Sequence, residues 1–79
     1  MKTVPKVVRQ FGLRVAKIRN ERAISQEKLG SLAGVHRTYI GMIERGEKNI
    51  TIANMEKIAR ALGLRLKDLV IFRTHFQDW

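Results

Sequence analysis

The most constraining feature of this chain is a pair of short apolar patterns separated by one glycine. Both patterns place apolar residues three or four positions apart, which puts those residues on one face of a helix. The inward-facing residues predicted in the two patterns are Leu29, Leu32 and Ala33, then Tyr39, Ile40 and Ile43. Gly34 stands between the patterns, and glycine suits the residue after a helix because it takes positive φ without steric cost. The sequence therefore predicts two short helices joined by a tight turn, with Val35 packed just after it.

Further helical patterns flank this pair. One runs from about Pro5 to Arg22, and Gly12 is expected to delay the start of its regular part. Ser25 and Thr51 are typical N-cap residues for the second and fourth helices. The inward-facing residues predicted for the fourth helix are Ile52, Met55, Ile58, Ala59 and Leu62, and a last short helix is expected over residues 66–72. The expected fold class is all-α, a compact bundle of five short helices in a single domain spanning residues 1–79.

The charge of the chain is strongly unbalanced. Sixteen lysines and arginines stand against seven aspartates and glutamates, giving a formal net charge of +9. In residues 1–22 only Glu21 opposes the basic side chains. Such a charge attracts polyanions and favours nucleic acid as a partner, while the alternative from charge alone is a solvated basic face without a partner.

The sequence offers little support for an enzyme. The only two histidines, His36 and His75, lie far apart, and no cysteine or carboxylate cluster joins them at metal-ligand spacing. Ser25 and Ser31 have no nearby base that the sequence identifies. We therefore expect no catalytic site, no metal and no cofactor. The lack of cysteine, of a signal peptide and of a long apolar run predicts a cytoplasmic protein that does not enter a membrane.

Residues 26–45 have the spacing of a helix-turn-helix motif, with Gly30 where the two helices must approach closely. The second helix of the motif is expected to leave His36, Arg37, Thr38, Gly41 and Met42 outside, and such a helix fits the major groove of DNA. From about Gly12 to Leu69, through GLRVAKIRNERAISQEKLGSLAG and VHRTYIGMIERGEKNITIANMEKIARALGL, the chain resembles the Cro and cI type of phage-repressor regulators, with a lambda-repressor-like fold. The segment HRTYIGMIERGEKNIT is most similar to the sequences of the controller proteins of restriction-modification systems.

The resemblance implies roles for the matched residues. Base contacts are expected from Arg37, Thr38 and Asn49, since arginine can fork onto guanine and threonine can offer a hydroxyl or a methyl group. Phosphate contacts are expected from Ser25, Gln26, Arg19, Arg22, Tyr39, Arg45 and Lys48. Tyr39 could equally be a ring packed at the helix edge, and Glu47 is expected to point away from phosphate.

Arg19 and Glu44 match a pair that joins the first helix of this family to the end of the third. The resemblance favours a structural role for the pair over a direct DNA contact, and the alternative is a surface pair worth less than about 1 kcal/mol. Two departures from the family pattern stand out. Ala23 replaces a usual glycine, and if positive φ is required there the alanine costs roughly 1–2 kcal/mol. His36 replaces a usual serine or threonine, which predicts a weaker cap for the third helix.

More apolar residues lie near the C-terminus than two short helices bury by themselves. These residues are Leu69, Val70, Ile71, Phe72, Phe76 and Trp79. They either complete the monomer's core or form a self-complementary patch. We expect the second, a homodimer with residues 50–79 as the dimerisation region and an interface that includes Ile50, Leu69, Val70 and Phe72. Two third helices about 34 Å apart would then predict an inverted-repeat operator in double-stranded DNA.

The sequence thus predicts a dimeric, sequence-specific DNA-binding regulator of transcription. By resemblance it is a restriction-modification controller, which activates its own and the endonuclease gene and represses at high dose, with RNA polymerase as a further partner. The rival hypothesis is an antitoxin-type protein, or a phage or mobile-element repressor, whose main role is to bind a protein partner or silence a promoter.

Overall fold

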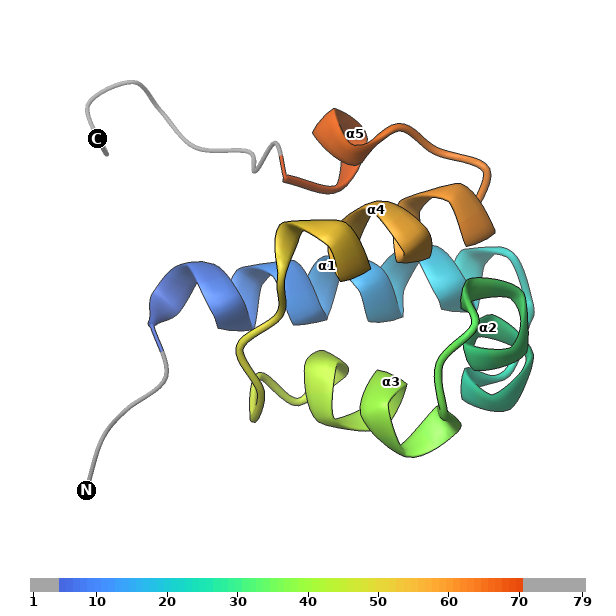
Figure 1. Ribbon diagram of the computed structural model, residues 1–79, viewed down its shortest axis with the longest axis horizontal. Coiled ribbons are helices and arrows are strands. Elements are labelled where there is room, and N and C mark those ends of the chain that lie inside the picture. Colours follow the sequence, from blue (N-terminus) through green and yellow to red (C-terminus); the bar gives the residue numbers. More distant parts are fainter. Residues whose placement is uncertain (1–4, 71–79) are drawn as a thin grey trace.

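The computed structural model describes residues 5–70, and within that range the chain forms five helices and no strand. The helices are α1 (Lys6–Glu21), α2 (Gln26–Ala33), α3 (Arg37–Glu44), α4 (Ile52–Ala61) and α5 (Leu66–Val70). Figure 1 shows α3 along one edge of the molecule and α5 along the opposite edge, with α1 between them. The expected all-α bundle is confirmed. None of the helices in the described range is long and apolar enough to cross a membrane.

The core forms where the five helices meet, with α1 packed on α3 and α5, and α2 packed on α3 and α4. Its buried members are Phe11, Val15, Ile18, Leu29, Ala33, Ile40, Ile43, Ile58, Ala59, Leu62 and Leu69. On α1 they recur three and four residues apart, so one stripe of that helix faces inward. Burying a leucine or isoleucine side chain contributes about 1.5–3 kcal/mol, whereas isolated helices this short are marginal in water. The packing of the helices against one another therefore holds the short helices in place.

Local capping and turn residues mark the helix boundaries where the sequence predicts them. The hydroxyls of Ser25 and Thr51 accept hydrogen bonds from backbone N–H groups three residues on, at 2.9 and 3.1 Å. Gly34 follows α2 with φ of 75°, as the turn requires. Ala23 also has positive φ, 56°, so the residue that replaces the family's glycine keeps the glycine's conformation. His36 does cap α3, because its Nδ1 accepts a hydrogen bond from the N–H of Thr38 at 3.0 Å.

Three expectations about individual positions are wrong. Gly12 does not delay α1, which runs unbroken through it, because the glycine is placed against α3. Leu32 is 52% exposed and Ile52 is 69% exposed, although both were expected to face inward. The other helices cover only a narrow stripe of α2 and α4, and both side chains lie outside it.

The C-terminal helix corrects one residue of the predicted dimer interface. Leu69 is completely buried in the core of its own chain, and so it cannot lie in an interface with a partner. It completes the monomer's core, which was the alternative that the sequence left open. Ile50 is partly buried and Val70 is exposed, whereas Phe72 lies outside the described residues.

Candidate nucleic-acid interface

Two glycines let α3 pack tightly against its neighbours. An ideal Cβ on Gly12 would overlap the carbonyl oxygen of Ile43, so α1 and α3 touch backbone to backbone. A Cβ on Gly30 would lie 2.6 Å from the carbonyl oxygen of Val35, just before α3 begins. These approaches confirm the close contact predicted at Gly30 and hold the inner face of α3 against the bundle.

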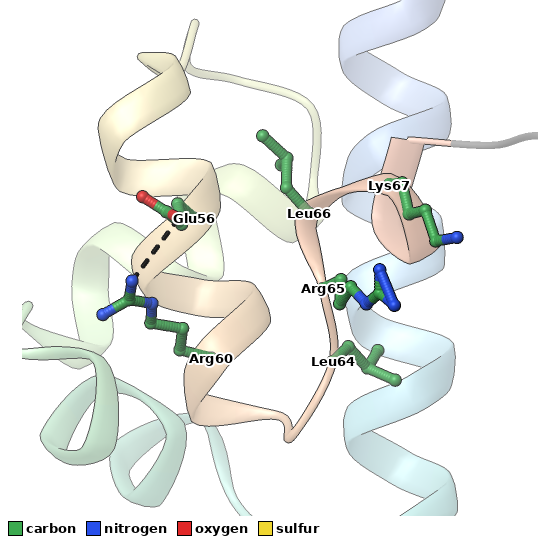
Figure 2. Close-up of a pocket in the computed structure, with 6 residues that line it drawn as sticks. All are labelled: Glu56, Arg60, Leu64, Arg65, Leu66 and Lys67. Carbon is green, nitrogen blue, oxygen red and sulfur yellow. Dashed lines mark ion pairs between the residues drawn. The ribbon is translucent and has the colours of Figure 1, made fainter.

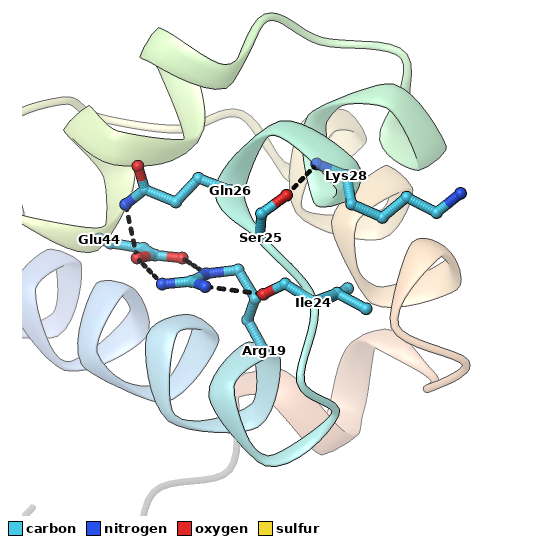
Figure 3. Close-up of polar contacts among 6 residues, drawn as sticks. All are labelled: Arg19, Ile24, Ser25, Gln26, Lys28 and Glu44. Carbon is cyan, nitrogen blue, oxygen red and sulfur yellow. Dashed lines mark hydrogen bonds and ion pairs between the residues drawn. The ribbon is translucent and has the colours of Figure 1, made fainter.

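A polar cluster of Arg19, Gln26 and Glu44 joins α1, α2 and α3 (Figure 3). Arg19 donates from Nε and Nη2 to the two carboxylate oxygens of Glu44, at 2.7 and 3.1 Å. Gln26 donates from Nε2 to the same carboxylate at 2.9 Å. Nη1 of Arg19 donates to the carbonyl oxygen of Ile24 at 2.8 Å. One carboxylate at the end of α3 therefore fixes the start of α2 and the last turn of α1.

The Arg19–Glu44 pair is largely shielded from water, with side chains 13% and 6% exposed. Its hydrogen bonds raise the pKa of Arg19 above the ordinary value, against the smaller lowering effect of burial. Because three nitrogens of the guanidinium point at partners inside the protein, the geometry favours the structural role over the predicted phosphate contact. Gln26, the other predicted phosphate contact of this cluster, is oriented by Glu44.

The outer side of α3 carries the predicted base-reading residues. Arg37 and Thr38 are exposed and lie in its first turn, and Met42 is half-buried one turn further on. Nη1 of Arg37 lies 4.0 Å from a carboxylate oxygen of Glu27 on α2, and both side chains are more than 60% exposed. An ion pair with such exposed side chains and such a long N–O distance contributes little to stability, so Arg37 can readily change partners.

The loop after α3 carries residues that are predicted to contact the DNA backbone. Arg45 donates from Nε to Glu47 at 2.9 Å, and both side chains are exposed. This hydrogen bond raises the pKa of Arg45 and lowers the pKa of Glu47. Lys48 and Asn49 follow as exposed residues, and Arg22 is exposed at the end of α1.

Tyr39 has the packed ring that was one of the two roles left open for it by the sequence. Its ring is partly buried against the core. Its hydroxyl oxygen accepts a hydrogen bond from Nδ2 of Asn54 at 3.0 Å, which fixes the ring relative to α4. A phenol that accepts one bond can still donate its own hydrogen, so a phosphate contact stays open to Tyr39.

Hollows outside the motif include two that are lined by described residues. The first is an apolar groove of about 260 Å³ at the start of α1 and the end of α5, lined by Val7, Val8, Phe11, Asn49, Ile50, Met55 and Val70. The second is an open hollow between α4 and α5, shown in Figure 2 and lined by Glu56, Arg60, Leu64, Arg65, Leu66 and Lys67. Arg60 pairs there with Glu56 at 3.6 Å. Neither lining includes a residue of α2 or α3, but the first hollow is lined in part by Asn49, a predicted base contact.

Comparison with known proteins identifies the arrangement of α2 and α3. Residues 15–69 match the family model described as Helix-turn-helix. The chain belongs to the helix-turn-helix family. This helix-turn-helix protein is accordingly a DNA-binding regulator of transcription rather than an enzyme, and its matched region runs from the middle of α1 to the end of α5.

Its relatives include restriction-modification controllers, which confirms the predicted resemblance. The chain is 49% identical over 65 residues to control protein C.BamHI of Bacillus amyloliquefaciens, covering 81% of this chain and 80% of that one. It is 41% identical over 56 residues to control protein C.SmaI of Serratia marcescens, covering 71% and 67%. The crystal structure of the controller protein C.AhdI from Aeromonas hydrophila superimposes with a TM-score of 0.76 at 38% identity, covering 80% of this chain and 94% of that one.

Sequence reasoning missed several contacts of the site. It did not predict that Glu44 holds Gln26, that Glu27 lies beside Arg37, or that Asn54 donates to Tyr39. The sequence does contain a signal for the close contact of α1 with α3. Gly12 stands three residues before Val15 on the buried stripe of α1. A glycine on an apolar stripe indicates a close approach of another backbone.

Proposed function

We propose that this helix-turn-helix protein binds an inverted-repeat operator as a homodimer and acts as the controller protein of a restriction-modification system. The observation that carries the proposal is the position of α3, which is held at its inner face by backbone contacts and the Glu44 cluster and presents an exposed Arg37 and Thr38 outside. The printed descriptions of its relatives as control and controller proteins support the choice of system.

In this proposal the first turn of α3 enters the major groove. Arg37 leaves its long contact with Glu27 and forks onto O6 and N7 of a guanine. Thr38 lies beside it and can donate to a base or press its methyl group against thymine. Asn49, in the loop beyond α3, is the third proposed base contact.

Phosphates are bound on either side of this helix. The N-terminus of α2, with Ser25 and Gln26, presents N–H groups and the positive end of the helix dipole to an anion. Lys48, Tyr39 and Arg22 supply further donors from the loop, from α3 and from the end of α1. The net charge of +9 strengthens all these contacts at low salt.

Selection from a random duplex DNA library tests the proposal. The expected product is an inverted repeat with half-site centres about one helical turn apart. A controller also requires that this sequence lie upstream of its own gene and of an endonuclease gene. Salt-sensitive binding without an enriched sequence would contradict the proposal and favour the antitoxin-type hypothesis.

Replacement of Arg37 separates base reading from charge. Arg37→Ala should weaken binding to the selected operator by about 1–3 kcal/mol and leave most binding to unrelated DNA intact. Lys48→Ala is the matched control, because loss of a phosphate contact weakens all sequences alike and lowers the salt slope by about one. Titrations of both variants with operator and unrelated DNA at several salt concentrations measure the affinities and the salt slopes. Equal losses of Arg37→Ala on both DNAs would make Arg37 a phosphate contact.

The apolar groove is the proposed dimer interface. It contains Ile50 and Val70, the two residues of the predicted interface that remain available on the surface, together with Val7 and Met55. Apolar side chains from separate parts of the chain gather there, and an apolar patch at the surface can pair with the same patch of a second copy about a two-fold axis.

An aspartate in the groove should separate the dimer. Val7 lines the groove in the first turn of α1, which has no acidic residue, so Val7→Asp suits the helix dipole while placing a charge in the interface. Its cost to dimerisation should be about 2 kcal/mol or more, measured by sedimentation equilibrium. Leu13→Asp is the control, because Leu13 is exposed on α1 outside the groove. Equal dissociation constants for Val7→Asp and Leu13→Asp would place the interface elsewhere.

A further inference from the structure

The outer face of α3 has a gap at Gly41. This residue was expected to point away from the core, and the three atoms nearest to an ideal Cβ on it belong to polar side chains, yet the residue is buried. Side chains from outside α3 cover it. The nearest atoms to an ideal Cβ on Gly41 would be Nη1 of Arg45 at 3.1 Å and Oε1 of Gln26 at 3.5 Å.

The exposed side chain of Arg45 therefore lies back along α3. Side chains of a helix tilt towards its N-terminus, and residues four apart share one face. Arg37, Gly41 and Arg45 form such a series, so the guanidinium of Arg45 reaches over Gly41 towards the turn that carries Arg37. The guanidinium of Arg45 can occupy this place because residue 41 has no side chain.

Glu47 fixes the direction in which the guanidinium points. It accepts the hydrogen bond of Nε at 2.9 Å, which orients the plane of the group. Among residues 5–70, the terminal nitrogens Nη1 and Nη2 of Arg45 have no hydrogen-bond partner, and the side chain is 57% exposed. Two parallel N–H donors on one open edge match the O6 and N7 acceptors of guanine.

We propose that Arg45 is a specificity residue that reads a second guanine in each half-site, placed by the gap at Gly41 and oriented by Glu47. This assignment rests on the proposed operator binding, and it replaces the phosphate contact expected for Arg45 from the resemblance. A phosphate requires only a positive charge, which lysine also supplies, whereas the fork onto guanine requires the planar guanidinium.

Library selection with wild-type protein, Arg45→Lys and Gly41→Ala tests the assignment. Arg45→Lys should lose the preference for one guanine per half-site by roughly 10- to 100-fold and keep the rest of the motif, including the base that Arg37→Ala affects. Gly41→Ala should weaken the preference for the same guanine, because its Cβ displaces Nη1 of Arg45. It should also raise the thermal midpoint, because alanine favours the helix more than glycine does.

The outcomes separate this assignment from the proposed function. A wild-type selection without any motif would refute operator recognition itself. A wild-type motif that Arg45→Lys reproduces unchanged would refute only the role of Arg45 and leave it as a phosphate contact. A lowered thermal midpoint for Gly41→Ala would show that residue 41 faces a packed site, and the proposed gap on the outer face would be wrong.

Discussion

Gly12→Ala is expected to destabilise the chain more than any other single methyl group added to it. The new Cβ would overlap the carbonyl oxygen of Ile43, so α1 and α3 would have to move apart. Backbone cannot rotate away as a flexible side chain can, and overpacking of this kind costs about 3 kcal/mol or more. A domain of this size has roughly 4–12 kcal/mol of stability in total, so the change is a large part of it. Urea denaturation at fixed protein concentration measures the effect.

The control for this prediction is Gly63→Ala. Gly63 has φ of 74° and no atom within 4 Å of its ideal Cβ, so alanine there meets only backbone strain of about 1–2 kcal/mol. Gly12→Ala should therefore lower the midpoint further than Gly63→Ala does. Inside an uncrowded helix alanine would stabilise by up to about 1 kcal/mol relative to glycine. A stabilised Gly12→Ala variant would thus contradict the close contact between α1 and α3.

Glu44→Ala should have the second large effect, on stability and on DNA binding together. The carboxylate accepts hydrogen bonds from Arg19 and Gln26, and its removal leaves the charge of Arg19 without its partner. Breaking a buried pair costs about 3–5 kcal/mol, and the partial exposure of Arg19 places this one near the lower end. Operator affinity should fall as well, because Glu44 sets the position of α2 relative to α3. Urea denaturation and operator titration below the transition measure the two effects.

Glu56→Ala is the matched control for Glu44→Ala. Glu56 pairs with Arg60 at 3.6 Å on the surface of α4, and such exposed pairs contribute under about 1 kcal/mol. The double variant Arg19→Ala with Glu44→Ala should be less destabilised than the sum of its single changes, since no charge is then left alone. Additive losses would show that the two side chains act independently of each other.

The sequence predicted the parts of this fold that depend on neighbouring residues. Caps at Ser25 and Thr51 and the turn at Gly34 require only local hydrogen bonds and a permitted φ, and they appear where expected. The Arg19–Glu44 pair came from the family resemblance rather than from spacing, because no local rule joins residues 25 positions apart. The family itself was also predicted from the sequence segments around α2 and α3, and the comparisons confirm it.

Tertiary structure alone decided which apolar and polar side chains meet. Periodicity assigned Leu32 and Ile52 to an inward face, but the width of that face depends on which helices cover it, and both are exposed. Leu69 had two possible fates in the sequence, and only the packing of α5 on the bundle places it inside its own core. The position of Arg45 over Gly41 likewise depends on the shape left between two helices, which no pattern along the chain encodes.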